Sequence, residues 1–118
     1  HVRAALAQRG IRAACLASTL ARRYDTVAGN DTVADVARSQ DPTCDLRGWL
    51  VVHPDQHDEA AAQMRRHLFT ERFVGAALYA DPVAGTPVTL ERSRELLMVF
   101  RRYGKALLIE TPSSEAML

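Results

Sequence analysis

The sequence predicts an α/β fold in which parallel strands alternate with helices, and three observations lead to this prediction. Short apolar segments of strand length alternate with longer segments of helical periodicity along the chain. The clearest strand, 48–53, is apolar without alternation, which is typical of a strand that is covered on both faces. A helix end, a glycine and an apolar strand follow one another twice, at Gly10 and at Gly104. Strands joined by helices pair in parallel through right-handed crossovers.

The first part of the chain contains two predicted helices and one predicted strand. A helix over 2–9 precedes a short apolar segment, 11–16, that has the length of a buried strand. Residues 18–29 are polar and irregular, and we expect a long connection there. A second helix is expected over 30–38, with Asn30 as its cap and an apolar face toward the core.

The second part predicts three further strands separated by two helices. Asp41-Pro42 ends the preceding helix, because a residue before proline is disfavoured in helical geometry. Thr89 is the expected cap of the last helix. The elements are strands over 48–53, 73–79 and 106–109 and helices over 59–69 and 89–103.

Length and composition indicate one α/β unit over 1–118. The chain has 118 residues, and its apolar content of 47% is enough to form a core. The balance of 15 Lys+Arg against 14 Asp+Glu is atypical of a nucleic-acid-binding protein, so we expect no nucleic-acid partner.

The apolar segments are too short for a membrane span, and two cysteines, Cys15 and Cys44, predict a cytoplasmic protein. Because the chain begins at His1 and not at methionine, we expect a fragment of a longer protein.

Three pairs of arginines stand next to an aromatic or imidazole side chain. Such clusters occur in nucleic-acid-binding proteins, but acidic residues near them cancel their charge. We therefore interpret them as solvated helix faces. The clusters are Arg22-Arg23-Tyr24, Arg65-Arg66-His67 and Arg101-Arg102-Tyr103.

Polar side chains follow the predicted strands at their carboxyl ends, where parallel α/β folds bind ligands. These expected substrate-rim residues are Ser18, His53, Tyr79 and Asp81, together with Glu110 after the last strand. Glu110 is a candidate metal ligand, because a carboxylate that ends an apolar strand needs a partner, solvent or a metal. The segment 53–58 carries two histidines and two aspartates, which predict either a divalent-metal site or an acidic loop that caps the following helix.

Five strings in their order resemble the amidohydrolase-related metal-dependent hydrolases, a TIM-barrel group that includes decarboxylases of aromatic acids. The strings are Gly10-Ile11-Arg12-Ala13-Ala14, Gly29-Asn30-Asp31, Gly48-Trp49-Leu50-Val51-Val52-His53-Pro54, Phe73-Val74-Gly75-Ala76-Ala77-Leu78-Tyr79 and Gly104-Lys105-Ala106-Leu107-Leu108-Ile109-Glu110-Thr111. The resemblance implies half of a (β/α)8 TIM barrel, covering about its second to fifth strands.

The resemblance also implies a function for the complete protein. That function is hydrolysis or decarboxylation of a small organic substrate with the help of a divalent metal, which would be Zn, Mn or Mg. Glu110 stands where the family's fifth strand ends in a metal-binding histidine. The family's other metal ligands would lie outside these residues, so we expect the chain alone to be inactive.

The alternative is a small four-stranded βα domain without catalysis that binds a small ligand or a protein partner. Such a domain would cover the open edges of its sheet by forming a homodimer.

Overall fold

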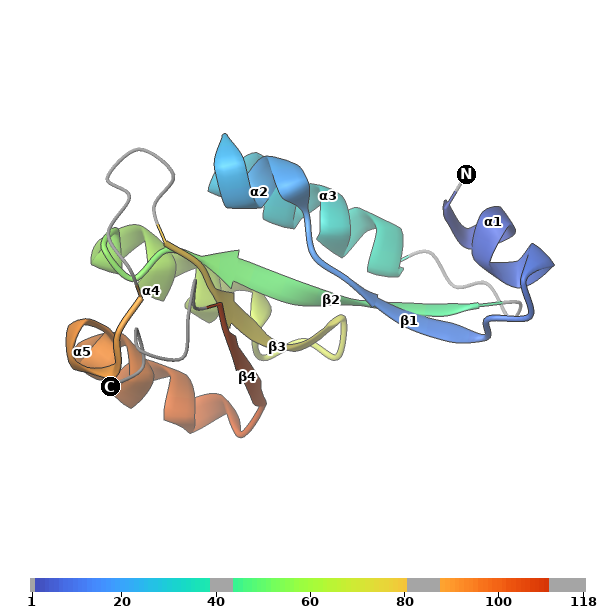
Figure 1. Cartoon of the computed structure of the whole chain (residues 1–118). Helices are drawn as coiled ribbons and strands as arrows, with labels where there is room; N and C mark the ends of the chain where they lie inside the picture. Colours follow the sequence, from blue (N-terminus) through green and yellow to red (C-terminus); the bar gives the residue numbers. More distant parts are fainter. Residues whose placement is uncertain (1, 39–43, 81–87, 111–118) are drawn as a thin grey trace.

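The computed structural model describes residues 2–38, 44–80 and 88–110, and these residues form an α/β fold with one parallel sheet (Figure 1). The strands are β1 (Ala13–Leu16), β2 (Asp45–Val52), β3 (Phe73–Leu78) and β4 (Ala106–Ile109). The helices are α1 (Val2–Gln8), α2 (Thr19–Arg23), α3 (Thr26–Arg38), α4 (His57–His67) and α5 (Leu90–Phe100), followed by the short 3-10 helix η1 (Arg101–Tyr103). The predicted fold class is confirmed.

The strands pair in sequence order, β1-β2-β3-β4, and every pairing is parallel. This order is that of a half barrel, in which each crossover moves one strand further in the same direction. The ladder is staggered, because β1 pairs with the first half of β2 and β3 pairs with its second half. One extra residue in β3, Val74, forms a bulge between the pairs Gly48–Phe73 and Trp49–Gly75.

The two faces of the sheet have different surroundings. Leu50, Val52 and Ala76 belong to the hydrophobic core, which the apolar sides of α3, α4 and α5 complete. Alternation along the strands places Trp49 and Leu108 on the opposite face, which corresponds to the interior of a barrel. Leu108 is 45% exposed there. The face that carries no core helix therefore keeps apolar surface accessible to water.

The repeated glycine junction has a structural reason at both positions. Gly10 and Gly104 have φ angles of 76° and 61°, in the left-handed region that glycine adopts without strain. At Gly10 the amide donates to the Ala7 carbonyl, and the Ile11 amide donates to the Leu6 carbonyl, which is the bond pair of a Schellman motif. Each glycine ends a helix and turns the chain toward the next strand.

The interpretation of residues 18–29 as a connection is wrong, because they contain α2 and the start of α3. Asp25 accepts from the Ala28 amide and so caps α3, which begins at Thr26 and not at residue 30. Asn30 is an interior residue of this helix and is fully buried. The predicted cap of the last helix is confirmed, since Thr89 accepts from the Arg92 amide.

Asn30 completes the sheet where a strand is missing. β1 ends opposite Gly48, so the edge of β2 beyond that position has no neighbouring strand among the described residues. The Asn30 side chain donates to the Val51 carbonyl at 2.8 Å and accepts from the Val51 amide at 3.0 Å. It also donates to the Gln63 side chain at 3.2 Å. One buried amide therefore joins α3, β2 and α4.

Candidate functional site

The carboxyl edge of the sheet brings together three side chains that are far apart in the sequence. Arg22 of α2 forms an ion pair with Glu110, which follows β4. The same guanidinium lies over the ring of Tyr79, which follows β3, at 4.6 Å from the ring centre. Both members of the ion pair are about two-fifths exposed. The edge therefore presents a cation that is held by an aromatic ring and a carboxylate and remains open to solvent.

Local sequence explains how Arg22 reaches this position. Ser18 follows β1 and accepts from the Ala21 amide, so that it caps α2. Gly29 of α3 allows α2 to pack closely, because a Cβ there would lie 2.3 Å from the Ala21 nitrogen. The cap and the close helix contact fix α2 above the strand ends, with Arg22 facing β3 and β4.

His53 lies at the same edge but is built into the fold. Its side chain is almost fully buried, with Nδ1 3.0 Å from the Tyr79 carbonyl oxygen and Nε2 3.3 Å from the Ala21 carbonyl oxygen. Both ring nitrogens therefore face backbone carbonyl oxygens, and the neutral ring donates its single N–H to one of the two. His53 connects α2 to the end of β3.

The predicted rim is thus assembled in part. His53, Tyr79 and Glu110 meet at one edge, while Ser18 is used as a helix cap. Asp81 lies outside the described residues.

The prediction of a divalent metal at Glu110 stays a prediction, and the described residues at this edge pair with one another. Glu110 is paired with Arg22, and each ring nitrogen of His53 lies within 3.3 Å of a backbone carbonyl oxygen. Nowhere in the described part of the chain do three His, Cys, Asp or Glu side chains gather in a metal-binding arrangement. In the segment 53–58, Asp55 pairs with Arg92 at 3.4 Å, and the residue that precedes α4, Gln56, forms no side-chain cap, so the predicted capping of this helix by an acidic loop is not seen.

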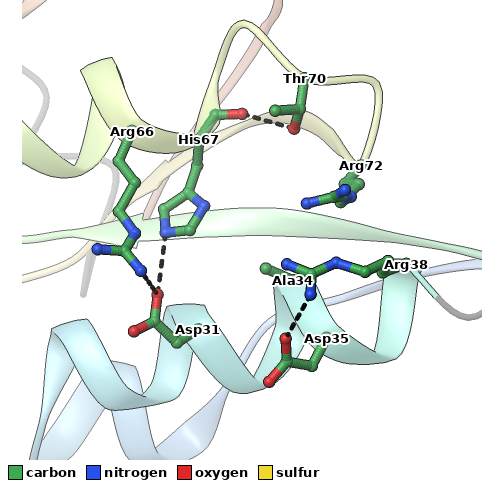
Figure 2. Close-up of a pocket in the computed structure, with 8 residues that line it drawn as sticks. All are labelled: Asp31, Ala34, Asp35, Arg38, Arg66, His67, Thr70 and Arg72. Atoms are coloured by element: carbon green, nitrogen blue, oxygen red, sulfur yellow. Dashed lines mark hydrogen bonds and ion pairs between the residues drawn. The ribbon is translucent and has the colours of Figure 1, made fainter.

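A second polar cluster lies at the amino end of the sheet, between α3, α4 and the segment that enters β3 (Figure 2). Arg66 forms an ion pair with Asp31 at 3.3 Å, and Arg38 forms one with Asp35 at 3.6 Å. The interpretation of Arg65-Arg66-His67 as a solvated helix face whose charge nearby acids cancel is therefore wrong for His67 alone. Arg66 is exposed but paired, and His67 is buried.

His67 is the buried centre of this second cluster. Its ring packs at 4.9 Å from the ring of Phe73, and its Nε2 lies 3.4 Å from an Asp31 oxygen without hydrogen-bond geometry. Burial lowers the pKa of His67 below its ordinary value of 6.5. Asp31 opposes this shift, while Arg66 and Arg72 add to it.

Acid should destabilise the fold through His67. Below pH 6.5 the unfolded chain binds a proton that the folded chain resists until a lower pH, so the free energy of unfolding falls as pH drops through that window. Urea unfolding from about pH 7.5 to about pH 5.5 should therefore show a smaller loss of stability in His67→Gln than in the parent chain. Equal pH dependence of both proteins would contradict this role.

Comparison with protein-family models, with curated proteins and with solved structures finds no significant match in any of the three. The resemblance to the amidohydrolase-related hydrolases therefore stays a prediction. In the part of the chain that the structure describes, no helix has the length and apolar content needed to cross a membrane.

Sequence reasoning missed the residue on which the carboxyl edge depends, Arg22. The sequence pattern around Arg22 indicates a solvated basic cluster, because it does not predict α2. The signal that could have revealed it is Ser18, a good helix cap that lies two residues after a strand and precedes a helix-forming stretch.

Proposed function

We propose that this chain forms one half of a (β/α)8-barrel enzyme and that its carboxyl edge binds a small organic acid. The observation that carries the proposal is the cluster of Arg22, Tyr79 and Glu110, formed by three different βα units. The activity would be the hydrolysis or decarboxylation that the family resemblance implies. Further strands against β1 and β4 would complete the barrel, either from a longer chain or from a second copy.

The chemistry of Arg22 supports an acid as the ligand. A guanidinium carries five N–H donors in a planar fork that matches a carboxylate. Among the described residues, its one hydrogen-bond partner is Glu110. The remaining donors of this partly exposed group are available to a second carboxylate. The Tyr79 ring keeps the guanidinium in one orientation and offers an apolar surface beside it.

Glu110 has a different role in this proposal from the one that the family resemblance implies. It holds Arg22 in place and compensates its charge when no acid is bound. The described residues supply no set of metal ligands, so metal-dependent chemistry would need ligands from outside them.

Replacing Arg22 should weaken the binding of a small aromatic carboxylate such as benzoate by at least about tenfold, because a charge-assisted hydrogen bond contributes about 1.5–3 kcal/mol. Isothermal calorimetry on Arg22→Gln measures this loss. The matched control is Arg23→Gln, since Arg23 is the next residue of α2 and is exposed. Benzamide, which lacks the charge, should bind weakly to all three proteins. Equal benzoate affinity in the parent chain and Arg22→Gln would overturn the proposal.

A further inference from the structure

The polar cluster at the amino end of the sheet lines a cavity of about 250 Å³ that is open to solvent on one side (Figure 2). Its walls come from α3, from the end of α4 and from the segment before β3. The lining residues that bear charge are Asp31, Asp35, Arg38, Arg66, His67 and Arg72. We propose that this cavity binds a small oxyanion such as phosphate, or the phosphate group of a small metabolite.

The balance of charge around the cavity favours an anion. Three guanidinium groups face two carboxylates, and each carboxylate is already paired, Asp31 with Arg66 and Asp35 with Arg38. Arg72 is the third guanidinium. It is half-buried and has no hydrogen bond or ion pair with any of the residues described. An unpaired charge in a partly buried position is unfavourable unless solvent or a ligand compensates it.

His67 provides a second, independent indication of a ligand. Its side chain is more than nine-tenths buried, and Nε2 lies 3.4 Å from an Asp31 oxygen without good hydrogen-bond geometry. Figure 2 shows the other ring nitrogen turned toward the side of the cavity where Arg72 lies. A buried polar ring at the wall of a polar cavity is expected to have its hydrogen-bonding capacity satisfied by a bound group.

Size and donor type define the ligand. The cavity is smaller than the ~300–1,000 Å³ that is usual for drug-sized molecules, so it suits an ion or the head of a small metabolite. Arginine forks bind phosphate oxygens in pairs, and the guanidinium groups of Arg38 and Arg72 lie across the same cavity. A carboxylate ligand would use fewer of these donors than a tetrahedral oxyanion.

This site is separate from the carboxyl edge. His67 ends α4 and Arg72 immediately precedes β3, so the cavity lies at the amino end of the strands. Barrel enzymes carry out their chemistry at the other end. An oxyanion here would act by stabilising the contact between α3 and α4, because it would bridge Arg38 of one to the segment that follows the other.

Calorimetric titration of the full chain with inorganic phosphate, at constant ionic strength set with sodium chloride, tests the proposal. Saturable binding is expected, and Arg72→Gln should weaken it by at least about tenfold. Arg38→Gln, at an exposed position where misfolding is not expected, should also weaken it. The matched control is Arg65→Gln, because Arg65 is an exposed residue of α4 that does not line the cavity.

The outcomes separate this site from general electrostatic attraction and from the carboxyl edge. Arg22→Gln should bind phosphate as the parent chain does, whatever its effect on benzoate. Absence of saturable phosphate binding would overturn the proposal. So would an equal loss of affinity in Arg65→Gln and Arg72→Gln, since that result would indicate attraction by net charge alone.

Discussion

Replacing Asn30 with leucine should lower the free energy of unfolding by about 3 kcal/mol or more. The substitution leaves the amide and carbonyl of Val51 and the side-chain oxygen of Gln63 without their partner. Each buried polar group that loses its hydrogen bond costs about 1–3 kcal/mol. Because small domains have only about 5–15 kcal/mol of stability, this single side chain carries a large share of it.

Urea unfolding followed by circular dichroism measures the loss. Asn30→Asp is a second variant of nearly equal size, which can accept from the Val51 amide but cannot donate to the Val51 carbonyl. It should also be destabilised. Thr32→Ala, an exposed change on the same helix, should cost less than about 0.5 kcal/mol. Similar stability of Asn30→Leu and Thr32→Ala would show that Asn30 does not join the two helices to β2.

Replacing Gly75 with alanine should displace β4 and disrupt the carboxyl edge. A Cβ on Gly75 would lie 1.8 Å from the Ala106 carbonyl oxygen, and that obstacle belongs to the backbone. β4 is an edge strand that pairs with β3 over four residues, so it moves more easily than β3. We expect a loss of about 3 kcal/mol, at the upper end of the usual range for overpacking. Glu110 would move with β4 and release Arg22.

Gly48→Ala is the matched comparison for this prediction. A Cβ at Gly48 would also meet close atoms, but these belong to the side chains of Val33 and Phe73, at 2.4 Å and 2.8 Å. Side chains shift at lower cost than a paired strand, so Gly48→Ala should lose less stability and keep the β4 amide signals in an NMR spectrum. If Gly75→Ala keeps these signals unchanged while Gly48→Ala loses them, the assignment of β4 as the strand that moves is wrong.

The strands and glycine junctions of this fold could be predicted because their causes are local. The segment 106–109 is apolar, bounded and preceded by Gly104, and the structure places β4 over the same residues. Gly10 and Gly104 indicate their turns because only glycine adopts positive φ without strain. Helix and strand ends shifted by one to four residues elsewhere, as expected where hydrogen bonding decides the last turn.

The role of Asn30 could not be predicted, because it depends on a distant event. An asparagine before a polar, helical stretch indicates a cap when only its neighbours are known. Its actual position in the middle of α3 follows from the early end of β1, which leaves Val51 without a strand partner. The residues around Asn30 do not indicate that β2 lacks a neighbouring strand at Val51.

The sequence predicts those residues of the carboxyl edge that follow strands, but it does not predict Arg22, which lies in a helix. Tyr79 and Glu110 follow β3 and β4 directly, so the rule for parallel sheets places them at one edge. Arg22 joins them because α2 packs on Gly29 of α3. The rule for parallel sheets places only residues at strand ends, so it does not predict a contact between two helices. His53 was placed at the correct edge, but its contacts with two carbonyl groups give it a structural role.

The central claim is that Arg22, Tyr79 and Glu110 form one binding site for a small organic acid. NMR titration of the isotope-labelled chain with benzoate tests it most directly. The account predicts shifts of the backbone amides of these three residues and little change around the amino-end cavity, with benzamide producing no comparable effect. Shifts centred on Arg38, Arg66 and Arg72, or shifts of equal size with benzamide, would contradict the claim.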